Sequence, residues 1–249
     1  MLRRAASIRL VVFDIYNTIV IPQTGLPDAP IEAFRRTFNH LKLNVPTNLI
    51  YRDYGHDKVY HLDQILTDQS VKNQLGKLIK KYGEQEMKKH MFKVFEKKQC
   101  EIVRDPRYSR LVPGFLDALT DLEYMGVKHF CTTTGFNTKM QRHVLKHMKQ
   151  QGFIPKIAVA SDTLMRPRPD PMGIAHIMEQ CGIFDPRQVV KVGDTAADIV
   201  EGLNANITTI GVEGTLSKQQ LENHGASLVI KSVKELPWAL NHLEHPGEN

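Results

Sequence analysis

The stretch Val192-Gly193-Asp194-Thr195-Ala196-Ala197-Asp198 says most about this chain, because in it an apolar strand pattern runs into an acidic loop at the start of a helix. Much earlier, Val11-Val12-Phe13-Asp14 is another apolar run that ends in an aspartate. Continuous apolar runs are typical of buried parallel strands, whose carboxyl ends meet at one edge of the sheet. The two stretches therefore predict that Asp14 and Asp194 lie close together at that edge.

Hydroxyl groups and a cation stand between these two aspartates in the chain. Thr133-Thr134-Gly135 follows a second apolar strand, and Arg168-Pro169 precedes a helix. Carboxylates, hydroxyls and a cation at one sheet edge suit phosphoryl transfer. In such a site Asp14 would attack phosphorus, and Asp194 would share a hard cation with it. Mg²⁺ fits this role because it takes oxygen ligands.

Strand and helix patterns alternate through the second half of the chain. Strands are predicted at 127–132, 157–160, 189–192 and 208–212. Helices are predicted at 115–124, 138–150, 170–181 and 196–203. Such alternation predicts an α/β fold with a doubly wound parallel sheet and right-handed crossovers.

The first half of the chain reads differently. Two stretches rich in proline and glycine, 22–30 and 106–114, read as linkers around a mainly helical pattern without a confident strand. We therefore expect a core domain made of residues 1–21 and 106–249. Residues 22–105 are expected to form a helical cap domain, inserted after the first strand and covering the site.

Bulk composition bears on two questions, namely membrane contact and the chemical state of the cysteines. The chain has 249 residues, 41% of them hydrophobic and 24% charged, and no apolar run approaches the roughly 18 residues of a membrane span. We therefore expect no membrane partner. Its three cysteines are far apart and odd in number, which favours reduced structural thiols over a disulfide framework or a zinc site.

The chain is basic, with a formal charge of +6 and a pI near 9.1. Lysines gather in the insert, at Lys72, Lys77, Lys80, Lys81, Lys88, Lys89, Lys93, Lys97 and Lys98. They form either a solvated helix surface or a patch for RNA. The start of the chain is basic, with no acid before Asp14, as in a presequence for the mitochondrial matrix. A short extension of accidental composition is the alternative.

These motifs resemble the haloacid dehalogenase superfamily, and within it the phosphonatases, or phosphonoacetaldehyde hydrolases. The resemblance covers residues 133–212 and includes Thr133-Thr134-Gly135, Gln151-Gly152, Arg168-Pro169 and Lys191-Val192-Gly193-Asp194-Thr195. It extends to the insert, where residues 54–61 match the family's Met-Gly-Leu-x-Lys-x-Asp-His segment at Gly55, Lys58 and His61.

The resemblance implies a role for each matching residue of the core. Asp14 would be the nucleophile and a Mg²⁺ ligand, and Thr134 would hold a phosphoryl oxygen. Arg168 would neutralise charge on the transferring group. Asp194 would bind Mg²⁺ and Asp198 would support it, while the main-chain carbonyl of Tyr16 would be a third protein ligand.

In the insert, the resemblance makes Lys58 the amine that forms a Schiff base with the substrate aldehyde. A carbanion is a poor leaving group, and an iminium turns the leaving carbon into an enamine. His61 would be a proton shuttle, because the pKa of a free imidazole lies near neutrality, or else a packing residue of the cap.

The chain departs from the phosphonatase pattern at several positions. Tyr16 and Asn17 replace a small Ala-Gly pair. Most phosphatases of the superfamily carry an acid at the position of Tyr16, but phosphonatases also lack that acid, so its absence agrees with the resemblance. Tyr54 replaces the family's Met, and Tyr60 its Asp. Residues 212–224 are fewer than in the family.

Two functions from different classes remain open at this point. The first is a Mg²⁺-dependent hydrolase acting on a small phosphonate or phosphate ester. The second is a retained fold with altered catalysis, serving as a structural or assembly subunit of a mitochondrial ribonucleoprotein. The corresponding partners are a small phosphorylated or phosphonate substrate, a second copy in a homodimer, and RNA or a ribonucleoprotein bound through the basic cap.

Overall fold

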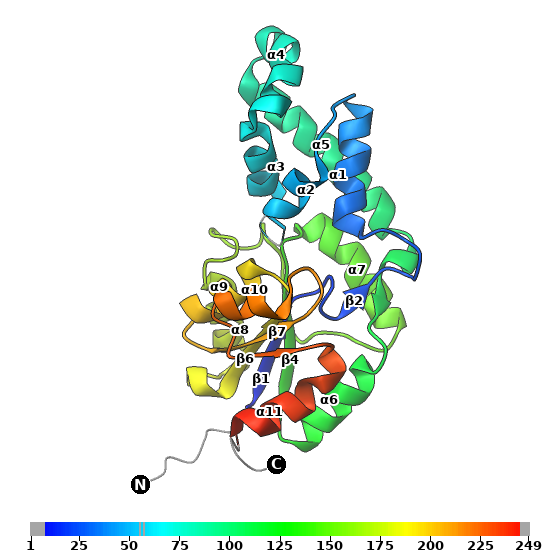
Figure 1. The fold of residues 1–249 in the computed structure, drawn as a ribbon. Coiled ribbons are helices and arrows are strands. Elements are labelled where there is room, and N and C mark those ends of the chain that lie inside the picture. Colours follow the sequence, from blue (N-terminus) through cyan, green and yellow to red (C-terminus); the bar gives the residue numbers. More distant parts are fainter. Residues whose placement is uncertain (1–7, 55, 57, 245–249) are drawn as a thin grey trace.

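A six-stranded parallel sheet forms the centre of the larger part of the molecule (Figure 1). The computed structural model describes residues 8–54, 56 and 58–244. The strands follow the order β5-β4-β1-β6-β7-β8 across the sheet. They span β1 Leu10–Phe13, β4 His129–Thr133, β5 Ala158–Val159, β6 Val189–Gly193, β7 Thr208–Val212 and β8 Leu228–Ile230.

Helices cover both faces of this sheet, which confirms the predicted doubly wound α/β fold. The core helices are α6 Phe115–Tyr124, α7 Thr138–Gln150, α8 Met172–Cys181, α9 Ala196–Asn204, α10 Lys218–Asn223 and α11 Leu236–Glu244. Val11 and Phe13 of β1 belong to the same apolar cluster as α6, α7 and α11, whereas Leu10 and Val12 pack with α8. Because successive residues of a strand face opposite sides, this split accounts for the continuous apolar run of β1.

Five helices form a second body above one edge of the sheet (Figure 1). They are α1 Ala29–His40, α2 Thr47–Arg52, α3 Lys58–Thr67, α4 Gln69–Tyr82 and α5 Glu84–Val103. All lie inside the predicted insert of 22–105, and α1 packs on α5 through Phe34 and Phe95, whose ring centroids are 4.5 Å apart. The apolar positions of these helices therefore bury one another, and the same apolar cluster continues into the core through α5 and α7.

A small antiparallel ladder joins the two bodies. β2 (Val20–Ile21) pairs with β3 (Arg110–Leu111), so the segments that enter and leave the cap lie side by side. β3 lies in the stretch read as the linker 106–114, and the short 3-10 helix η1 (Pro106–Tyr108) precedes it. Strands of two residues carry too little periodicity to be found in a sequence.

No helix in the described part of the chain is long and apolar enough to cross a membrane. The presequence-like residues 1–7 lie outside the described residues, and mitochondrial localisation stays a prediction.

Several lysines of the cap form ion pairs within it: Lys88 contacts Asp63 and Glu84, and Lys89 contacts Glu86. The remaining 3-10 helices are η2 Pro186–Gln188 and η3 Val233–Glu235.

Candidate active site

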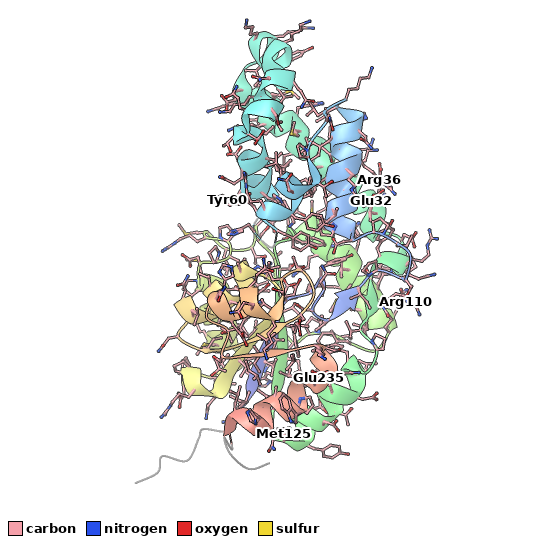
Figure 2. All side chains as sticks on the ribbon, viewed as in Figure 1. Glu32, Arg36, Tyr60, Arg110, Met125 and Glu235 are labelled. Atoms are coloured by element: carbon pink, nitrogen blue, oxygen red, sulfur yellow. The ribbon has the colours of Figure 1, made fainter. Side chains whose placement is uncertain are left out.

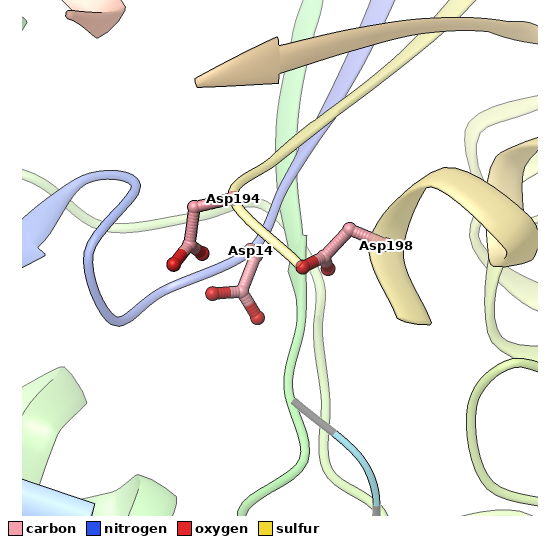
Figure 3. A group of neighbouring side chains, drawn as sticks. All are labelled: Asp14, Asp194 and Asp198. Atoms are coloured by element: carbon pink, nitrogen blue, oxygen red, sulfur yellow. The ribbon is translucent and has the colours of Figure 1, made fainter. Parts of the chain in front are cut away.

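Three aspartates meet where β1 and β6 end (Figure 3). Asp14 follows β1, Asp194 follows β6, and Asp198 lies in the first turn of α9. One carboxylate oxygen from each lies within 4.8 Å of the other two. β1 and β6 are direct neighbours in the sheet, so the predicted approach of Asp14 to Asp194 is confirmed.

The turn from β6 into α9 places Asp198 through local geometry. The Thr195 hydroxyl and the Asp198 carboxylate form a capping box, which satisfies free N–H groups at the start of α9. A Cβ atom at Gly193 would lie 2.3 Å from the Asp198 side chain. A glycine is therefore required at residue 193 for Asp198 to reach the site.

Arg168 links the nucleophile candidate to Asp198. Its side chain is buried, and Nη1 donates to Asp14 Oδ1 at 2.8 Å and to Asp198 Oδ1. Arg168 thereby stands beside the carboxylate that is expected to attack phosphorus. This position suits a cation that neutralises charge on a transferring phosphoryl group.

Sequence reasoning missed a second layer of charged residues, which lies behind the three aspartates. Lys191 Nζ, fully buried in β6, contacts Asp198 and Glu201, each at 3.1 Å, and donates to Thr133 Oγ1 at 2.7 Å. Glu201 also accepts from the Thr133 hydroxyl. A lysine inside the apolar run 189–192 was the available signal, because an ordinary buried strand does not place a charge there.

The balance of charge at the site favours a divalent cation. Four carboxylates surround two cations, namely Asp14, Asp194, Asp198 and Glu201 around Arg168 and Lys191. With all groups ionised, these buried residues carry a surplus of two negative charges, and an unbalanced buried charge is costly. Oxygen-only donors with this surplus fit Mg²⁺, so the side chains are compatible with the metal.

The surplus of negative charge also affects the pKa values of the three aspartates. Burial, together with repulsion from Asp198, raises the pKa of Asp14 from 3.8 to about 6, against the opposing effect of Arg168. Burial and the charge of Asp14 raise the pKa of Asp194 well above its usual value, although Thr18 and Thr215 donate to its carboxylate. Burial would also raise the pKa of Asp198, but Arg168 and Lys191 outweigh it and lower that pKa.

Stability should consequently depend on pH and Mg²⁺ together. A raised pKa means that the folded state binds the Asp14 proton more tightly than the unfolded chain does. That stabilisation is complete below pH 3.8 and is lost as pH rises through about 6, a loss of about 3 kcal/mol for metal-free protein. Since Mg²⁺ would supply the missing positive charge, it should raise the melting temperature more at pH 7.5 than at pH 5.

Differential scanning fluorimetry at both pH values, with Mg²⁺ or EDTA, measures this dependence. Asp14→Asn serves as the matched variant, because it removes the titrating group and should reduce the difference between the two pH values. An equal gain from Mg²⁺ at pH 5 and pH 7.5 in the native protein would contradict the expectation.

Thr134 is left as the hydroxyl candidate for a phosphoryl oxygen. The Thr133 hydroxyl is committed to the Lys191–Glu201 pair, whereas among the described residues Thr134 Oγ1 accepts a single long contact, 3.3 Å, from the Phe136 N–H. Thr134 is the residue directly after β4, beside β1 in the sheet. It therefore lies at the same sheet edge as the aspartates.

Lys58 lies in the cap at the first residue of α3 and is only 4% exposed. Its Nζ lies 5.3 Å from the centre of the Tyr54 ring. Its positive charge opposes the rise that burial causes in the pKa of Asp28, at the start of α1. Gly55, which helped to define the match around Lys58, lies outside the described residues.

Tyr60 is 46% exposed and points outward from the cap (Figure 2), with its ring 5.0 Å from that of His56.

His61 sits deep in the cap. It is fully buried, and its ring lies 4.4 Å from that of Phe34. Burial, together with the positive charge of the neighbouring Lys58, lowers the pKa of His61 to about 2. An imidazole that stays neutral at all physiological pH values makes a poor proton shuttle, so this environment favours the packing alternative.

Comparison with known proteins agrees with this geometry. Residues 11–212 match the family model described as haloacid dehalogenase-like hydrolase. The chain belongs to the haloacid dehalogenase-like hydrolases. Within that family it is similar to the phosphonoacetaldehyde hydrolase of Latilactobacillus sakei, with 32% identity over 96% of this chain and 97% of the relative. The phosphonoacetaldehyde hydrolase of Bacteroides fragilis is 29% identical over 84% of this chain and 88% of the relative.

A solved structure extends the likeness to the whole fold. The phosphonoacetaldehyde hydrolase-like protein of Oleispira antarctica superposes with a TM-score of 0.85 at 24% identity, covering 100% of this chain and 99% of that one. Cap and core of this haloacid dehalogenase-like hydrolase therefore share the arrangement found in that protein.

Tyr16 is the sharpest departure of this hydrolase from the phosphonatase pattern. Its ring packs 5.0 Å from that of Phe136, and its hydroxyl donates to the Tyr108 carbonyl at 2.7 Å. The side chain is thereby held by the linker that leaves the cap. Its main-chain carbonyl receives no backbone N–H from the described residues, and its role as a metal ligand stays a prediction.

Removing the Tyr16 hydroxyl should therefore cost stability. Tyr16→Phe leaves the buried Tyr108 carbonyl without this donor, for an expected loss of about 1–3 kcal/mol in the free energy of unfolding. Urea denaturation measures the loss, with Tyr124→Phe, at a tyrosine that is 88% exposed, as the matched control. A Tyr16→Phe protein as stable as the native one would show that the tether contributes nothing.

Proposed function

We propose that this hydrolase is a Mg²⁺-dependent phosphonatase that cleaves the carbon–phosphorus bond of phosphonoacetaldehyde or a closely related small phosphonate. The observation that carries the proposal is the pairing of two reactive centres. The core offers the buried Asp14–Asp194–Asp198 triad with Arg168, and the cap offers the buried amine of Lys58. A simple phosphate-ester hydrolase needs only the first of these centres.

The chemistry begins at the cap. The Lys58 amine adds to the aldehyde carbon and water leaves, giving an iminium. Asp14 Oδ then attacks phosphorus, the carbon–phosphorus bond breaks, and its electron pair moves into the iminium to form an enamine. Protonation of the enamine carbon and hydrolysis of the imine release acetaldehyde, and water hydrolyses the aspartyl-phosphate to restore Asp14 and free phosphate.

The remaining residues stabilise charge during these steps. Arg168, 2.8 Å from the nucleophile, would neutralise the phosphoryl oxygens, and the Thr134 hydroxyl would donate to one of them. Lys191, which is itself paired with Glu201, holds the Asp198 carboxylate in place. Mg²⁺ held by Asp14 and Asp194, and supported by Asp198, would supply the positive charge that the site lacks.

A phosphate-release assay tests the proposal. Phosphonoacetaldehyde and a panel of phosphate esters are compared, each with Mg²⁺ and with EDTA. We expect phosphonoacetaldehyde to be the preferred substrate and EDTA to remove the activity. A preference for a phosphate ester would support a hydrolase function but exclude phosphonatase activity. Absence of any activity would leave the assembly role, to be sought by pull-down from mitochondrial extract with and without RNase.

A further inference from the structure

A hydrogen-bonded cluster outside the acidic triad joins the cap to the core. Asp28 Oδ2 accepts from Asn17 Nδ2 at 2.8 Å and from the Tyr54 hydroxyl at 2.9 Å. The three residues come from separate segments: Asn17 from the loop after the nucleophile, Asp28 from the start of α1, and Tyr54 from the segment between α2 and α3. We call these three residues the Asp28 cluster.

The cluster reaches the catalytic centre through the core. Asn17 Nδ2 also lies 3.2 Å from Thr215 Oγ1, and the Thr215 hydroxyl donates to Asp194. Asn17 holds this position with a left-handed backbone (φ 59°), a conformation that asparagine tolerates better than most residues. One short chain of hydrogen bonds therefore runs from a candidate metal ligand to the cap.

The same cluster reaches Lys58 through the cap. The Lys58 ammonium lies 5.3 Å from the centre of the Tyr54 ring, within the range of a cation–π contact. The Tyr54 side chain is 8% exposed, and its hydroxyl is fixed on Asp28, so the ring has a set orientation beside the amine. Tyr54 thereby connects the residue expected to form the Schiff base with the core.

Two members of the cluster are positions where this chain departs from the phosphonatase pattern. Asn17 stands in place of a glycine and Tyr54 in place of a methionine, and their side chains converge on one carboxylate. The two departures are therefore physically coupled. Together with Asp28 and Thr215 they are among the residues that line a cavity of about 400 Å³.

We propose that Asn17, Asp28 and Tyr54 act as one positioning unit that fixes the Lys58 amine between cap and core for attack on an aldehyde. The role rests on the proposed phosphonatase function. A lysine side chain has many rotamers, and addition to a carbonyl requires the amine at near-attack geometry. The tether from the nucleophile loop to the Tyr54 ring supplies that restraint.

Two reactions of one protein separate positioning from general damage. Reductive trapping by borohydride with phosphonoacetaldehyde requires the Lys58 amine, whereas hydrolysis of p-nitrophenyl phosphate requires the core residues around Asp14 and does not require Lys58. We expect Tyr54→Phe and Asp28→Asn each to lower the ratio of trapping rate to ester hydrolysis by about tenfold. Tyr54→Leu, which also removes the ring, should lower it by about 100-fold.

Another lysine–tyrosine pair in the cap provides the matched control. Lys81 Nζ lies 4.9 Å from the centre of the Tyr82 ring, which is 54% exposed. Tyr82→Phe should leave the ratio unchanged. Thermal denaturation of all variants shows whether each is folded, and the ratio is unaffected by a change in the folded fraction.

The outcomes distinguish this inference from the function on which it rests. A native protein that forms no adduct contradicts the phosphonatase proposal, and the positioning role falls with it. A native adduct whose formation is unchanged in Tyr54→Phe and Asp28→Asn contradicts the positioning role alone. Equal losses in trapping and ester hydrolysis also overturn it, because they would indicate a merely structural cluster.

Discussion

Asp14→Asn is expected to lower phosphate release by at least about 10⁴-fold, because an amide cannot form the aspartyl-phosphate. The exchange is nearly isosteric, and it removes a buried charge that the fold disfavours when no metal is bound. The variant should therefore be folded, and without Mg²⁺ it should be at least as stable as the native protein at pH 7.5. Loss of activity will then report chemistry rather than unfolding.

Steady-state phosphate release with saturating phosphonoacetaldehyde measures this effect. Asp185→Asn is the matched control, because Asp185 is a surface residue that pairs with Arg187 away from the triad. Activity of Asp14→Asn within tenfold of the native value would exclude Asp14 as the nucleophile.

Lys58→Arg should remove phosphonoacetaldehyde cleavage by at least about 10³-fold while reducing phosphate-ester hydrolysis far less. Arginine keeps the positive charge, but its guanidinium is not deprotonated in proteins and so cannot form the imine. The ratio of the two activities therefore isolates the covalent role of the amine from its charge.

Lys81→Arg is the control for this substitution, since Lys81 is also a cap lysine set against a tyrosine ring. Parallel kinetics on both substrates provide the measurement. If Lys58→Arg cleaved phosphonoacetaldehyde at the native rate, electron withdrawal by an iminium would not be part of the reaction.

Much of the core was predictable because local pattern and tertiary structure agree there. The run ending at Asp14 is buried on both faces between β4 and β6, so its composition had to be apolar throughout. The acidic loop at Asp194 follows the neighbouring strand, and parallel pairing alone brings the two carboxylates together. Residues 213–249 were left without assigned elements, because β8 is short and α10 has only six residues.

The less predictable features depend on contacts between segments far apart in the chain. Lys191 forms buried ion pairs with Asp198 and Glu201, and both Lys191 and Glu201 also bind the hydroxyl of Thr133, which comes from the distant strand β4. Asn17 and Tyr54 appeared as separate departures, and Asp28, on which both converge, lies in a stretch that reads as a linker. His61 matched a family position, but its burial against Phe34 follows from how α3 packs on α1.

The most direct test of the phosphonatase account is mass spectrometry of the protein after borohydride reduction in the presence of phosphonoacetaldehyde. If cleavage proceeds through a Schiff base on Lys58, the native protein should carry an N-ethyl group on that residue, because reduction captures the imine after phosphorus has left. Asp14→Asn should instead carry the uncleaved phosphonoethyl group on Lys58. An adduct on another lysine, or none on Lys58 in a protein that still releases phosphate from phosphonoacetaldehyde, would contradict the account.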